Sequence, residues 1–136
     1  MIFIDTGAFV ARHVRGDQYF KIAAKVWNQI LQNKTRCFTS NFVLDETATL
    51  IARKAGYKFS AQVMKSLYAS PRLEILRPTP EIELKAVDLF GKYADQEVSF
   101  TDCTSFALMH AHRLTQVFCF DRHFDDPGFS RIPLVR

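Results

Sequence analysis

The sequence predicts an α/β protein, a three-layer α/β/α sandwich built around a mainly parallel sheet. Short, continuous apolar runs alternate along the chain with longer segments in which apolar residues recur at helical spacing. Such runs are typical of strands that are buried on both faces, as in parallel sheets. The chain has 136 residues, of which 48% are hydrophobic. This supplies one core, and we expect a single domain over residues 1–136.

Five apolar runs are expected to form strands, at residues 2–4, 36–39, 73–76, 117–120 and 132–135. The first run ends at Asp5, and Asp121 directly follows the fourth. The carboxyl ends of parallel strands lie at the same edge of a sheet, where ligands of such folds bind. We therefore expect Asp5 and Asp121 to lie close together at that edge.

Helices are expected between these runs, at residues 6–14, 17–33, 41–55, 80–93 and 101–113. Ser40 or Asn41 can cap the third of them. Ser60 is expected to cap a further helix, with Phe59 and Met64 spaced as a hydrophobic staple around its start.

Composition and charge narrow the class of protein. No signal peptide and no apolar run of ~18 residues occurs, so a cytoplasmic protein without a membrane span is expected. Cys37, Cys103 and Cys119 are odd in number and lack C-x-x-C spacing, which indicates neither a disulfide framework nor a zinc-thiolate site. The net charge is +4; without four acids it would be +8, from 18 basic and ten acidic residues. A basic body around an acidic site suits an enzyme that attracts a polyanion.

Two further acids are candidates for the same site. Glu46 lies in the middle of a predicted helix, with Phe42 and Leu50 four residues away on either side. A carboxylate on such a partly apolar face needs a cation or hydrogen-bond donors, although a surface glutamate or a pair with Arg53 would also account for it. Asp102 opens a helix, where aspartate commonly complements the helix dipole.

Taken together, the four acids predict a metal site on one rim of the sheet, formed by Asp5, Glu46, Asp102 and Asp121. Clustered carboxylates repel each other, and a divalent cation relieves that repulsion. A ligand set of oxygens alone suits Mg²⁺ or Mn²⁺ better than zinc. Thr6 either hydrogen-bonds a carboxylate or a water on the metal, or it simply caps the first helix.

Several basic residues and one histidine are further candidates for contacts with a substrate. Arg12, Lys54 and Arg122 are candidates for phosphate contacts, although most basic residues are simply solvated. His123 is close to Asp121 in sequence, but an isolated histidine is more typical of a surface or packing position.

Four short motifs resemble those of the PIN domain family: residues 2–6 (IFIDT), 40–46 (SNFVLDE), 99–102 (SFTD) and 118–124 (FCFDRHF). They cover nearly the whole chain in the order and spacing of that family. The chain length is similar to that of the VapC-type toxins of prokaryotic toxin–antitoxin pairs.

This resemblance implies an α/β/α fold and a ribonuclease that needs Mg²⁺ or Mn²⁺ to hydrolyse RNA. It also implies a homodimer that a cognate antitoxin protein inhibits. It assigns the catalytic and metal-binding roles to the same quartet of Asp5, Glu46, Asp102 and Asp121. Thr6 matches the hydroxyl residue that follows the first aspartate in the family.

The sequence departs from the family in two places. Cys103 stands where a small residue, usually alanine, follows the third acid. Asp125 and Asp126 crowd the last motif, so either could share or replace the role of Asp121.

Three other functions fit parts of the pattern. A PIN-type nuclease could process RNA without being a toxin, and a module on the same fold could bind RNA without cleaving it. A phosphoaspartate enzyme fits poorly, because a dehalogenase-type phosphatase needs a second aspartate where this chain has Gly7.

Overall fold

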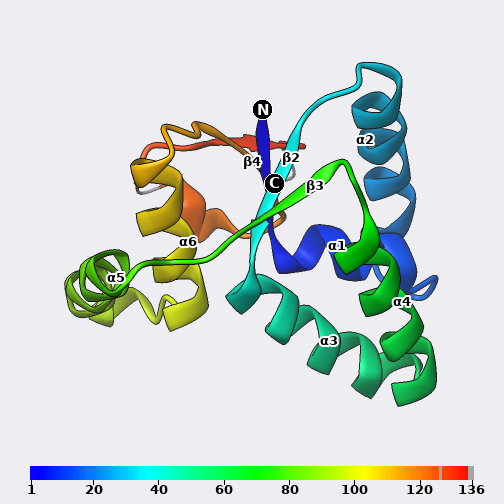
Figure 1. Cartoon of the computed structure of the whole chain (residues 1–136), viewed down its shortest axis with the longest axis horizontal. Helices are drawn as coiled ribbons and strands as arrows, with labels where there is room; N and C mark the ends of the chain where they lie inside the picture. Colours follow the sequence, from blue (N-terminus) through cyan, green and yellow to red (C-terminus); the bar gives the residue numbers. More distant parts are fainter. Residues whose placement is uncertain (126, 135–136) are drawn as a thin grey trace.

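The computed structural model describes residues 1–125 and 127–134. Its five strands form one sheet in the order β3-β2-β1-β4-β5, and every neighbouring pair is parallel. Helices cover both faces: Figure 1 shows α5 and α6 on one side of the sheet and α1, α2 and α4 on the other. The predicted α/β sandwich is therefore confirmed, and its sheet is wholly parallel in the described residues.

The strands are β1 (Ile2–Ile4), β2 (Cys37–Ser40), β3 (Leu73–Leu76), β4 (Gln116–Phe118) and β5 (Ser130–Ile132). The helices are α1 (Thr6–His13), α2 (Phe20–Gln32), α3 (Asn41–Ala55), α4 (Tyr57–Ala69), α5 (Pro80–Lys92) and α6 (Phe100–Ala111). Two short 3₁₀ turns, η1 (Ala94–Gln96) and η2 (Arg122–Phe124), complete the described elements.

The core is formed where β1 and its neighbours meet the helices. Ile2, Phe3 and Ile4 of β1 are all buried, as expected for a central strand covered on both faces. Phe106 of α6 and Phe118 of β4 are fully buried as well. All three cysteines are buried free thiols. No helix in residues 1–125 or 127–134 is long and apolar enough to cross a bilayer.

Two strands end differently from the prediction. β4 ends at Phe118, so Asp121 does not follow the strand directly but comes after Cys119 and Phe120. β5 spans Ser130–Ile132 rather than residues 132–135, and residue 135 lies outside the described part of the chain.

The predicted start of the fourth helix at Ser60 is wrong. α4 already begins at Tyr57, because Gly56 adopts a φ of +99° and lets the chain turn from α3 into α4 without a linker. Ser60 lies within α4, and its hydroxyl donates a hydrogen bond to the carbonyl of Ala48 in α3 at 2.7 Å. Phe59 is likewise inside the helix and forms no staple at its start.

Two capping serines fix the beginnings of the helices that carry Glu46 and Asp102. Ser40 Oγ accepts a hydrogen bond from the Val43 N–H at 3.1 Å, and Ser99 Oγ accepts one from the Asp102 N–H at 3.0 Å. Each cap satisfies a backbone N–H that the first turn leaves free. The orientation of both acids relative to the sheet edge is therefore set locally.

Candidate active site

An open pocket of about 730 Å³ brings together the four acids predicted from the sequence. Asp5 follows β1, Glu46 lies on α3, Asp102 on α6, and Asp121 in the loop after β4. Four segments that are far apart in sequence thus present carboxylates to one space beyond the carboxyl ends of the central strands. This is the edge at which parallel sheets bind ligands.

Asp5 is the most enclosed acid of the pocket. It is 5% exposed, and its Oδ1 atom is buried without a hydrogen-bond partner in the described structure. The pKa of Asp5 is raised to about 7, chiefly by burial and to a smaller extent by the charges of Glu46 and Asp121, while a hydrogen bond with the Thr6 backbone lowers it. A buried carboxylate oxygen without a donor is a position that a cation would satisfy.

The pKa of Asp102 is raised even more than that of Asp5. Burial in the first turn of α6 is the main cause that raises its pKa to about 9, followed by the charges of Asp5 and Asp121. Asp102 also shares a hydrogen bond with Asp121 that favours its protonated form. Without a compensating positive charge, Asp102 therefore retains its proton near neutral pH and Asp5 is about half protonated, whereas a divalent cation would favour the ionised form of both.

Glu46 faces the pocket and is held there by Thr6. The Thr6 hydroxyl donates a hydrogen bond to Glu46 Oε2 at 2.7 Å. The alternative pair between Glu46 and Arg53 is not found among the described ion pairs. Thr6 is not a helix cap either, since the N-cap position of α1 is Asp5. The prediction that Thr6 bonds a carboxylate is confirmed.

His123, for which a surface or packing role was expected, lies beside two of the acids. Its Nδ1 is 3.2 Å from Asp121 Oδ1 and 3.6 Å from Asp102 Oδ2. One atom each from Asp102, Asp121 and His123 lie within 4.8 Å of one another, which is close enough for a common metal ion. In the sequence, His123 stands two residues after Asp121. This spacing brings the two side chains together because η2 turns the chain at these residues.

Asp125 is engaged elsewhere. Its carboxylate accepts two hydrogen bonds from the buried Arg131 side chain, at 2.7 Å from Nε and 3.1 Å from a terminal nitrogen. This ion pair lowers the pKa of Asp125 below its usual value. Asp125 is not among the described residues that line the pocket. Asp126, the other additional acid considered, lies outside the described residues.

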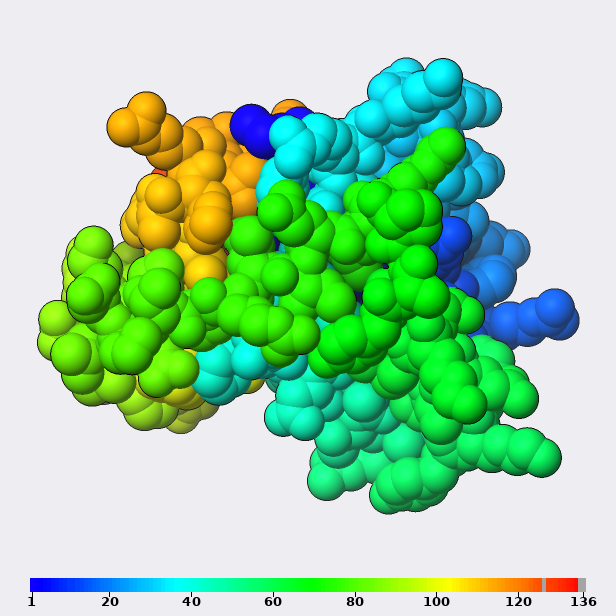
Figure 2. Space-filling view, in the orientation of Figure 1, coloured from blue at the N-terminus to red at the C-terminus, as the bar shows by residue number. Residues whose placement is uncertain are grey.

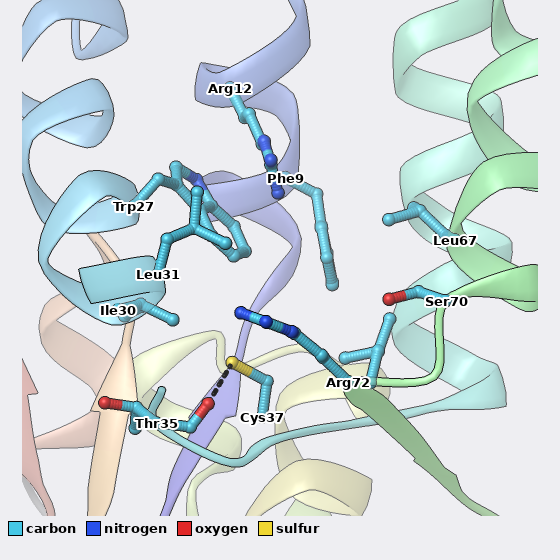
Figure 3. Close-up of a pocket in the computed structure, with 11 residues that line it drawn as sticks. Phe9, Arg12, Trp27, Ile30, Leu31, Thr35, Cys37, Leu67, Ser70 and Arg72 are labelled. Atoms are coloured by element: carbon cyan, nitrogen blue, oxygen red, sulfur yellow. Dashed lines mark hydrogen bonds between the residues drawn. The ribbon is translucent and has the colours of Figure 1, made fainter. Parts of the chain in front are cut away.

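Two of the three basic candidates for phosphate contacts line the pocket. Lys54 and Arg122 do so, but Arg12 does not. Its guanidinium lies over the Trp27 ring, 4.5 Å from the ring centre. Figure 3 shows Arg12 in a separate, mostly apolar cleft between α1, α2 and α4, with Arg72 on its other side. Arg12 therefore lies outside the pocket that holds the acids.

An aromatic pair on the pocket wall was not predicted from the sequence. Tyr19, from the loop between α1 and α2, stacks on Phe120 with ring centres 4.2 Å apart and an interplanar angle of 3°. Gly7 lies next to this pair, and a Cβ added there would be in ordinary van der Waals contact with the Phe120 ring, at 3.7 Å. The residues come from distant segments, so no local pattern links them.

A parallel α/β sheet with a carboxylate-lined pocket at its carboxyl edge defines the class of the protein, an α/β protein whose buried acids form a candidate cation site. The PIN domain family model matches residues 2–130. The chain therefore belongs to the PIN domain family.

Relatives of known activity agree with this assignment. The chain is 30% identical over 132 residues to the 23S rRNA-specific endonuclease VapC20 of Mycobacterium tuberculosis, covering 97% of this chain and 98% of that protein. It is 28% identical over 131 residues to a VapC ribonuclease of Archaeoglobus fulgidus, covering 94% and 81%. The crystal structure of M. tuberculosis VapC20, a sarcin–ricin loop cleaving toxin, superposes with a TM-score of 0.85 at 29% identity, covering 95% and 96%. These relatives are VapC-type ribonucleases.

Proposed function

We propose that this chain is a Mg²⁺- or Mn²⁺-dependent endoribonuclease that hydrolyses phosphodiester bonds of RNA, as the toxin of a type II toxin–antitoxin pair. It would act in the cytoplasm as one domain over residues 1–136. One observation carries the proposal: four carboxylates converge in a single pocket, and the most buried of them leaves an oxygen without a partner.

Asp5, Glu46, Asp102 and Asp121 would hold the cation. A divalent cation in such a site supplies positive charge to the phosphate and lowers the pKa of water. The side chains around the site determine how the carboxyl groups are positioned and hydrated. Thr6 fixes the position of Glu46, and the burial of Asp5 and Asp102 keeps both carboxyl groups poorly hydrated, so that they gain most from a cation.

The surroundings of the acids suit a nucleic acid. Lys54 and Arg122 line the pocket, and their positive charges would contact the phosphates of a bound strand. The stacked pair of Tyr19 and Phe120 provides an aromatic surface of the kind on which proteins stack unpaired bases. Because the relative VapC20 acts on 23S rRNA, an RNA fragment containing the sarcin–ricin loop is the first substrate to test.

A homodimer and a cognate antitoxin belong to the same proposal. α5 exposes Leu84, Val87 and Phe90, whose side chains are 66%, 52% and 46% accessible. Their spacing of three residues places them in one row. Figure 2 shows α5 and its neighbours protruding at one margin of the molecule, where a second copy can approach. An apolar row of this kind is typical of a self-associating surface.

The decisive experiment compares the wild type with Asp5→Asn on labelled RNA in Mg²⁺ and in Mn²⁺. We expect the substitution to reduce cleavage by at least about 10³-fold while leaving the fold as stable as before or more so. EDTA should abolish RNA cleavage by the wild type. Asp88→Asn, at an exposed position on α5, is the matched control and should cleave normally.

Full activity of Asp5→Asn, or of the wild type in EDTA, would contradict the proposal. The toxin role is tested separately, by expressing the protein in cells with and without the product of an adjacent small gene. Growth arrest that this gene relieves supports a toxin. Cleavage without growth arrest supports an RNA-processing nuclease instead.

A further inference from the structure

The metal site contains one side chain that is not an acid. We propose that His123 supplies a nitrogen ligand through Nδ1, so that this centre favours Mn²⁺ over Mg²⁺. The inference rests on the proposed function, since it concerns the same cation. It replaces the oxygen-only ligand set that the sequence predicted.

The distances are those of neighbouring ligands around one ion. Mg²⁺ and similar ions hold their ligands octahedrally at about 2.1 Å, which places adjacent ligand atoms about 3 Å apart. His123 Nδ1 lies 3.2 Å from Asp121 Oδ1 and 3.6 Å from Asp102 Oδ2. A cation between these three atoms requires only a slight contraction of the cluster.

The imidazole nitrogen has no other role in the described structure. Nδ1 is buried and makes no hydrogen bond, because its direction to the nearby carboxylates is poor despite the short separation. Asp5 Oδ1, also without a partner and on a residue that is only 5% exposed, lines the same pocket. A buried nitrogen without a hydrogen-bond partner, within reach of Asp102 and Asp121, is a position that a cation would satisfy.

The position of His123 is built into the fold. Asp121 Oδ1 accepts the His123 backbone N–H at 2.9 Å, so the same turn fixes both side chains. The next residue, Phe124, is fully buried and packs edge-on against Phe106 of α6 with ring centres 4.9 Å apart. α6 also carries Asp102. All three candidate ligands are thus attached to one rigid unit.

The chemical consequence is a change of metal preference. Mg²⁺ is bound almost entirely by oxygen, whereas imidazole nitrogen binds transition metal ions well. A pocket of carboxylates with one imidazole therefore binds Mn²⁺ more tightly than the same carboxylates alone, and gains little for Mg²⁺.

The test is pulsed electron paramagnetic resonance of the Mn²⁺-loaded protein, which detects a nitrogen bound directly to manganese. We expect a strong ¹⁴N coupling in the wild type and its loss in His123→Ala. His112→Asn is the matched control, because His112 is exposed at the end of α6, and it should keep the coupling. Titration calorimetry should show the Mn²⁺ affinity of His123→Ala reduced by about tenfold or more, with a much smaller loss for Mg²⁺.

Labelling the wild type with ¹⁵N-histidine makes the test independent of whether His123→Ala folds. The label should replace the ¹⁴N pattern by that of ¹⁵N. Mn²⁺ that binds without any nitrogen coupling overturns the role of His123 and leaves the nuclease proposal intact. Mn²⁺ affinity that is unchanged by Asp5→Asn would instead contradict the metal site itself.

Discussion

The hydroxyl of Thr6 donates a 2.7 Å hydrogen bond to Glu46 Oε2 and so joins the first residue of α1 to the middle of α3. Glu46 is only partly buried and has a flexible side chain, so without this bond its carboxylate would sample several orientations. Thr6 stands directly after Asp5, and the two acids are therefore positioned by consecutive residues of one chain segment.

Replacing Thr6 with valine should slow RNA cleavage by about 10- to 100-fold, the usual cost of removing a group that orients a metal ligand. Valine keeps the shape but cannot donate the hydrogen bond. The measurement is kcat at saturating metal, together with metal affinity by calorimetry. Thr6→Ser retains a hydroxyl and should stay close to the wild type. Equal losses in the valine and serine variants would show that packing, not the hydrogen bond, is what matters.

The stability of the metal-free protein should fall as the pH rises from about 4 to 9. Burial raises the pKa of Asp5 to about 7 and that of Asp102 to about 9, whereas the ordinary value for an aspartate is 3.8. In this window the folded protein binds more protons than the unfolded chain, so deprotonation favours unfolding. Thermal melting in EDTA at pH 5, 7 and 9 measures the effect.

Asp102→Asn should flatten that pH dependence and raise the melting temperature of the metal-free protein at pH 7 by about 2–4 °C or more. Adding Mn²⁺ should stabilise the wild type at pH 7 to 9 and have less effect on this variant, which lacks one of the ionised ligands. A melting temperature in EDTA that is flat or rises from pH 5 to 9 would show that these carboxyl groups are not the coupled, buried cluster described above.

The sequence predicted the acids whose positions follow from where a strand ends or a helix begins. Asp5 ends a short buried strand, and parallel topology dictates where its side chain emerges. Asp102 was expected in the first turn of a helix, and Glu46 on a helix that Ser40 or Asn41 could cap, which are local signals. Such features could be recognised because each rests on a few consecutive residues.

The remaining features depend on tertiary contacts that no local pattern records. His123 lies beside the acids in a turn whose next residue, Phe124, packs against α6, and Tyr19 reaches Phe120 from a distant loop. The start of α4 was missed because Ser60 looks like a cap in sequence but bonds a carbonyl of the neighbouring helix. Propensity and capping rules do not distinguish these two uses of a serine hydroxyl.

Asp125→Asn should destabilise the protein without removing a catalytic group. Arg131 is 8% exposed, and Asp125 accepts two hydrogen bonds from its guanidinium. Weakening that pair leaves a buried donor poorly satisfied, which costs about 1–3 kcal/mol. Chemical denaturation measures the loss, and cleavage per folded molecule should stay near the wild-type value. A large fall in cleavage with unchanged stability would instead place Asp125 among the catalytic acids.

Val87→Glu should prevent the proposed homodimer from forming through α5. Val87 lies between Leu84 and Phe90 in the exposed row on α5, so two copies related by a twofold axis would bring it close to the same helix of the partner. Two like charges buried there have no counter-ion, and their desolvation opposes association. Light scattering coupled to size-exclusion chromatography measures the mass. Tyr57→Glu is the control, because Tyr57 is 76% exposed at the start of α4, away from this row. A Val87→Glu protein that remains dimeric while Tyr57→Glu dissociates would place the interface on α4 instead.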